Sequence, residues 1–93
     1  MVLKLVTIDL LIPNCSSLKE KRYILSSIKT RLRRKFNISV SEIDFQNKWQ
    51  RSRLAIAAVG VDRTIVDQAC GHAFKLIEDD FRVEILDYAE EFR

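Results

Sequence analysis

Two stretches of the chain are apolar at nearly every position. Residues 2–12 are mostly Val, Ile and Leu and stop at a Pro-Asn pair, and residues 49–61 contain the longest apolar run, 54–60. Both alternating sets of side chains are largely apolar there, which predicts two central strands of a sheet. Residues 38–45 and 83–89 mix apolar and polar positions, which is typical of edge strands, and residues 46–48 are expected to form a turn.

Two further stretches show helical periodicity. Ser17 and Glu20 have the spacing of a capping box, so we predict a helix that begins there and continues to about Lys35. Its apolar stripe consists of Leu18, Leu25, Ile28, Leu32 and Phe36. Asp62 is a good N-cap for a second helix that ends near Asp79. The buried stripe of that helix is predicted to be Ile65, Val66, Ala69, Cys70, Ala73, Leu76 and Ile77.

The predicted order of elements, βαββαβ, is that of a ferredoxin-like sandwich in the α+β class. Right-handed crossovers then place the strands in the order four, one, three, two in an antiparallel sheet, with both helices on one face. Residues 1–93 are expected to form one domain. The other face of the sheet has no helical layer, so we expect a second copy of the chain to cover it in a homodimer.

Positive charge is concentrated in the first predicted helix. The net charge of +3 conceals twelve Lys and Arg against four Asp and Glu in residues 1–61, and four against nine in residues 62–93. Four cations fall within an arc of about 80° on that helix and are here called the cationic stripe: Lys19, Arg22, Lys29 and Arg33. The stripe either follows the phosphates of an RNA or only keeps an outer helix face solvated.

The predicted topology brings residues 16–22 and 44–51 to one end of the sheet. Trp49 and Arg51 should then lie near the cationic stripe, where the indole either stacks on a base or packs structurally. The candidate nucleic-acid site is therefore the stripe with Trp49 and Arg51. The same end holds Ser17, Glu20, Lys21, Asp44 and Gln50. Because Lys21 falls within the apolar arc of its helix, we predict that it pairs with Asp44 or Asp9.

The sequence offers no recognisable chemistry. Its two isolated glycines exclude phosphate-binding and dinucleotide-binding loops. Cys70 and His72 lack a metal-ligand spacing, and Cys15 before a helix is either an activated thiol or a small buried one. We expect no enzyme, metal or cofactor. Without a long apolar run, an export signal or a disulfide framework, the chain is expected to be cytoplasmic and free of membranes.

Three separated segments resemble the YlxP-like family of small bacterial proteins, whose domain is catalogued as one of unknown function: residues 17–22, 36–44 and 49–51. The resemblance covers nearly the whole chain and implies a ferredoxin-like fold. Genes of this family often neighbour those of ribosome-binding factor A and translation initiation factor 2, which implies an association with ribosomes. We therefore expect an RNA- or ribosome-associated accessory factor. The alternative is a homodimeric protein-interaction or scaffold module without catalytic activity.

Overall fold

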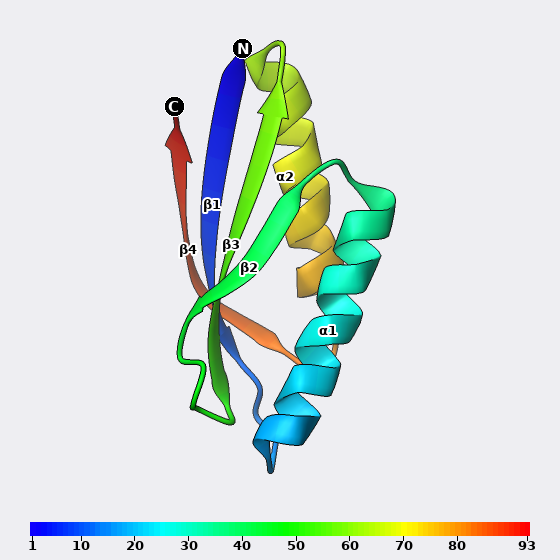
Figure 1. The fold of residues 1–93 in the computed structure, drawn as a ribbon, viewed down its shortest axis with the longest axis vertical. Helices are drawn as coiled ribbons and strands as arrows, with labels where there is room; N and C mark the ends of the chain where they lie inside the picture. Colours follow the sequence, from blue (N-terminus) through cyan, green and yellow to red (C-terminus); the bar gives the residue numbers. More distant parts are fainter.

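The protein is an antiparallel four-stranded sheet with two helices on one face, and the computed structural model describes all of residues 1–93 (Figure 1). The elements follow one another as β1 (Val2–Leu11), α1 (Leu18–Lys35), β2 (Ser39–Asp44), β3 (Arg51–Gly60), α2 (Arg63–Glu78) and β4 (Glu84–Phe92). The strand order across the sheet is β2-β3-β1-β4. The predicted ferredoxin-like order is confirmed, including the central places of β1 and β3.

The predicted elements are all present, with shifted ends. The third strand begins at Arg51 rather than at Trp49, which leaves Trp49 in the β2–β3 hairpin loop. The last strand continues to Phe92, beyond the predicted end at Ala89, because it pairs with β1 as far as Lys4. Alternation was the signal for this strand, and it fades among the acidic residues near the C-terminus although the backbone pairing continues.

The core lies between the helices and one face of the sheet. Every second residue of the central strands points into it, including Ile8 and Leu10 of β1 and Leu54 and Ile56 of β3, all at most 1% exposed. From α1 and α2 they meet side chains spaced at helical intervals: Ile24, Leu25, Ile28, Leu32, Val66, Cys70, Ala73, Leu76 and Ile77. Burying one such aliphatic side chain contributes about 1.5–3 kcal/mol, so this interface supplies most of the hydrophobic stabilisation.

Both predicted helix caps are present, and one of them differs in detail. The Ser17 hydroxyl accepts a hydrogen bond from Glu20 N at 3.1 Å, as a capping serine does. The Glu20 carboxylate, however, accepts from the amide and hydroxyl of Ser16 rather than from Ser17 N. The Asp62 carboxylate accepts from Ile65 N at 3.0 Å. Ile65 itself is 46% exposed, contrary to the prediction, because the sheet-facing positions of α2 begin one residue later, at Val66.

The face of the sheet opposite the helices, here called the open face, is covered by no other element (Figure 1). Its outward residues on β1 are Leu3, Leu5, Thr7, Asp9 and Leu11, and on β3 they are Arg51, Arg53, Ala55, Ala57 and Val59. The expected apolar character is therefore limited to the half near Leu3 and Val59. The other half is charged.

Neither helix is long and apolar enough to cross a membrane.

Candidate functional site

The start of α1 and the β2–β3 hairpin lie at the same end of the molecule, as predicted (Figure 1). Lys21 Nζ donates a hydrogen bond to the carbonyl oxygen of Phe45 at 2.6 Å. Gln50 Nε2 donates to the carbonyl oxygen of Cys15 at 3.3 Å, and Gln50 O accepts from Ile12 N at 2.9 Å. These bonds attach the hairpin to the segment that leads into α1, so Lys21 and Gln50 act structurally here.

Lys21 is buried and pairs with a carboxylate that the sequence analysis did not name. Its Nζ lies 2.9 Å from Glu42 Oε2, which also accepts from the Ser52 hydroxyl at 2.7 Å. The prediction of Asp44 or Asp9 is wrong because those two residues lie on the open face. Glu42 stands opposite the buried Leu54 and points toward the helices, and the register of β2 shifts immediately after it, before Asp44.

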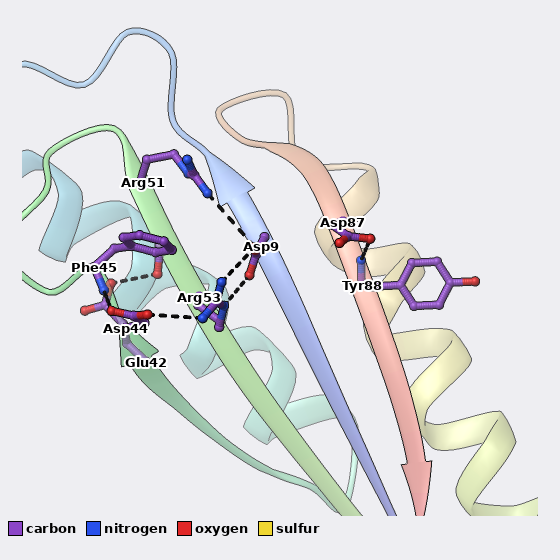
Figure 2. Close-up of polar contacts among 9 residues, drawn as sticks. Asp9, Glu42, Asp44, Phe45, Arg51, Arg53, Asp87 and Tyr88 are labelled. Atoms are coloured by element: carbon purple, nitrogen blue, oxygen red, sulfur yellow. Dashed lines mark hydrogen bonds and ion pairs between the residues drawn. The ribbon is translucent and has the colours of Figure 1, made fainter.

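Phe45 follows β2 with a left-handed backbone, φ 64°. This conformation is strained for a bulky residue and needs compensating contacts. Asp44 Oδ1 accepts from Phe45 N at 2.7 Å, and the guanidinium carbons of Arg51 and Arg53 lie 4.6 and 5.1 Å from the centre of the ring (Figure 2). The hairpin corner is thus held by a short polar bond and two cation–π contacts.

The charged half of the open face is organised around Arg53. Its guanidinium donates to both oxygens of Asp9, at 2.5 and 3.1 Å, and to Asp44 Oδ2 at 3.1 Å (Figure 2). The hydrogen bonds from Arg53 lower the pKa of Asp9 below its ordinary value. Asp87 stands beside Asp9 on β4 with no ion-pair partner, and these side chains line a hollow of about 340 Å³.

Arg51 belongs to this open face rather than to the α1 surface. Its Nη2 lies 4.0 Å from Asp9 Oδ2, and its buried Nε has no hydrogen-bond partner. The cationic stripe lies on the opposite side of the sheet, in the helical layer. The structure therefore separates Arg51 from the cationic stripe but leaves it beside Trp49, with which it lines one hollow.

The cations of α1 are mostly unpaired. Of its eight Lys and Arg, two form ion pairs: Lys21 with Glu42, and Arg31 with Asp80 at 3.3 Å. The other six have no carboxylate within 4.0 Å: Lys19, Arg22, Lys29, Arg33, Arg34 and Lys35. Arg33 differs from the rest because it donates to the carbonyl oxygen of Val40 at 3.0 Å, which leaves it less free to meet a ligand.

Trp49 lies at the tip of the hairpin and is 52% exposed. It lines a shallow hollow whose other residues all belong to the same loop and the first position of β3, from Asn47 to Arg51. No cation–π contact or ion pair joins it to the cationic stripe, of which only the first members lie at this end of the fold. About half of the tryptophan surface is exposed, so a base could reach it.

A second polar network, which the sequence analysis missed, joins α1 to the loop before β4. Asp80 is 5% exposed and accepts from the Arg82 guanidinium at 2.7 and 3.0 Å, while Arg82 also donates to the hydroxyl of Ser27 at 3.2 Å. Arg31 contacts the same carboxylate. Hydrogen bonds from Arg82 lower the pKa of Asp80. In the sequence, Asp79 and Asp80 resemble an ordinary polar helix end, so no local signal distinguished them.

The two cysteines are buried thiols. Cys15 is 2% exposed and its Sγ donates to the carbonyl oxygen of Ser17 at 3.2 Å. Burial raises the pKa of Cys70. His72 lies beside Phe36, with ring centres 6.0 Å apart. Nowhere in residues 1–93 do three His, Cys, Asp or Glu side chains gather closely enough to hold a metal ion.

Comparisons with known proteins agree with the fold and name no activity. A family model described as a protein of unknown function (DUF503) matches residues 3–90. An uncharacterised protein of Bacillus subtilis (strain 168), YlxP, is 38% identical over 76 residues, which cover 82% of this chain and 83% of the relative. Among solved structures, the de novo designed protein Foldit4 aligns over 100% of this chain and 97% of its own, with 10% identity and a TM-score of 0.57. That likeness concerns the fold alone.

Proposed function

The chain belongs to the DUF503 family of proteins of unknown function, and from this premise we propose that it is a cytoplasmic RNA-associated accessory factor that binds through α1. The observation that supports the proposal is the set of six cations on α1 without a carboxylate partner. The family resemblance, which implies an association with ribosomes, makes ribosomal RNA the first ligand to test.

The electrostatics of α1 favour a polyanion. Glu20 is the only acid on a helix that carries eight Lys and Arg, so its single negative charge offsets little of the positive charge. From Lys19 to Arg33 the helix rises about 21 Å, at about 1.5 Å per residue, which is enough to follow several phosphates. Binding to phosphates is independent of sequence and releases counterions, so it weakens as salt rises.

Fluorescence anisotropy with a labelled single-stranded fragment of ribosomal RNA tests the proposal. If about four phosphates are neutralised, log K should fall with log salt at a slope near −3, since each phosphate contributes about 0.7 for a single strand. Arg22→Glu should weaken binding to every sequence and make the slope less steep. Arg22 is exposed and has no ion-pair partner, so its substitution should leave the fold intact.

Arg63→Glu is the matched control, because it changes the net charge equally on the other helix. Arg63 is exposed at the start of α2 and has no ion-pair partner, and its cation–π contact with Phe92 contributes about 0.5–1 kcal/mol. This variant should keep nearly full affinity. The proposal fails if the unchanged protein does not bind at about 50 mM salt, or if both variants lose affinity equally.

A second candidate function is a homodimeric interaction module, which the open face favours. Half of that face is largely apolar, and the other half carries groups that are incompletely paired: Arg51, whose Nε has no hydrogen-bond partner, and Asp87, which has no ion pair. A face with these features can complement a second copy of itself across a two-fold axis. Sedimentation equilibrium, which measures the mass of the protein in solution, tests for this dimer.

A further inference from the structure

Two exposed aromatic side chains, one from α1 and one from the loop before β4, line the same hollow. Phe81, in the loop before β4, is 93% exposed, and Tyr23 of α1 is 72% exposed. Both line one hollow of about 370 Å³, whose floor includes the buried Ile12 and Ile24. Neither ring fills the core, so the fold does not explain why aromatic residues stand at these two positions.

The loop that carries Phe81 is firmly held. Its neighbours on both sides, Asp80 and Arg82, are the centre of the network that ties this loop to Ser27 and Arg31 of α1. The backbone contributes further bonds, from Asp80 N to Ile77 O at 3.1 Å and from Arg82 N to Asp80 Oδ1 at 3.0 Å. A ring presented on such a loop loses little conformational entropy when a ligand covers it.

Positive charge borders the aromatic pair. Tyr23 also lines a second hollow, of about 560 Å³, that runs along the outer face of α1 and includes Lys19, Arg22 and Arg31. Of the acids near Phe81 in the chain, Glu78 and Asp79 contact Lys75 and Asp80 contacts Arg82, whereas Glu84 has no ion pair. One carboxylate, Glu20, lines the hollow that the two rings share. The two exposed rings therefore adjoin the cations of α1 with a single acid between them.

We propose that Tyr23 and Phe81 stack on unpaired bases of a single-stranded RNA while Lys19 and Arg22 contact its phosphates. This inference rests on the proposed function and adds the class of ligand and the site where its bases lie. Alternating aromatic and cationic side chains match the bases and phosphates of a single strand. A duplex keeps its bases stacked inside, so it would use the cations without the rings.

The test compares two probes of one sequence of about ten nucleotides, single-stranded and in a duplex, because single-strand sites span about 4–16 nucleotides. Phe81→Ala and Tyr23→Leu should each weaken single-strand binding about 5- to 150-fold and leave duplex binding and the salt slope unchanged. Tyr23→Phe keeps the ring and should retain affinity. A probe with 2-aminopurine should lose fluorescence on binding to the unchanged protein and less on binding to Phe81→Ala.

Val61→Ala is the matched control, because Val61 is an exposed apolar residue, 79% exposed, that follows the C-terminal end of β3. It should change neither affinity. Far-ultraviolet circular dichroism checks that the variants are folded, which is expected since both rings are largely exposed. If the ring variants bind single strands as the unchanged protein does while Arg22→Glu weakens binding, the stacking site is wrong and the proposed function stands. If the unchanged protein binds neither probe, both proposals are overturned.

Discussion

Lys21 and Glu42 form an ion pair of 2.9 Å beneath the first turn of α1, where the lysine side chain is only 2% exposed. Removing one partner of a buried pair leaves a charge without compensation, which costs about 3–5 kcal/mol. Glu42→Ala should therefore lower the free energy of unfolding by about that amount. Urea denaturation followed by circular dichroism measures the change.

A double substitution distinguishes the pair from simple packing loss. Lys21→Met combined with Glu42→Leu removes both charges, so it should destabilise much less than the sum of the two single changes. Lys19→Met, on the exposed side of the same turn, should stay within about 0.5 kcal/mol of the unchanged protein. Additive effects of Lys21→Met and Glu42→Leu would show that the two charges do not interact.

Acid should destabilise the fold through Asp80. Hydrogen bonds from Arg82 hold the pKa of Asp80 below the value of about 3.9 that an unfolded chain has. A group with a lowered folded pKa stabilises the protein above its unfolded pKa, and this stabilisation is lost as pH falls through the folded value. The free energy of unfolding should therefore decrease as the pH drops below about 4. Asp9, whose pKa is also lowered, contributes in the same direction.

Asp80→Asn separates the contribution of Asp80 from that of the other carboxylates. The amide cannot titrate, so the variant should be less stable at pH 7 and should lose less stability than the unchanged protein between about pH 4 and pH 2. Urea unfolding at a series of pH values provides the comparison. Parallel curves for the two proteins would contradict the role assigned to Asp80.

The architecture could be predicted because it depends on local patterns. The two doubly apolar stretches identified β1 and β3 as central, and Ser17 and Asp62 marked where the helices begin. The partner of Lys21 could not be predicted, because a register shift between Glu42 and Asp44 decides which carboxylate faces the helices. A shift of this kind has no signature in the spacing of apolar residues.

The surface was predicted less completely than the core. The cationic stripe could be predicted from helical angles, since its four members need only belong to one helix. Arg51 was assigned to the same site because the topology brings the hairpin to the start of α1, but the pleat of β3 directs its side chain to the open face. Phe81 gave no signal at all, because an apolar residue among polar ones in a short loop is equally compatible with burial and exposure.

Trp49→Ala tests whether the indole binds RNA or only supports the hairpin. If a base stacks on the indole, affinity for single-stranded RNA should fall by about 1–3 kcal/mol while the melting temperature stays nearly unchanged. If the indole only supports the hairpin, the melting temperature should fall and the folded protein should keep its affinity. Anisotropy titration and thermal circular dichroism on the same samples separate the two results.

The open face should be the contact of a homodimer. The apolar half around Leu5 and Val59 is partly exposed in one copy of the chain, and a second copy related by a two-fold axis would cover this half on both copies. Sedimentation equilibrium at micromolar concentration should then give twice the mass of 10.9 kDa.

Val59→Asp, on the open face and 52% exposed, should convert the dimer to monomers by burying an unpaired charge in the interface. Thr64→Asp, at an exposed position on α2, introduces the same charge on the other side of the molecule and should leave the dimer intact. A monomeric unchanged protein would exclude the dimer.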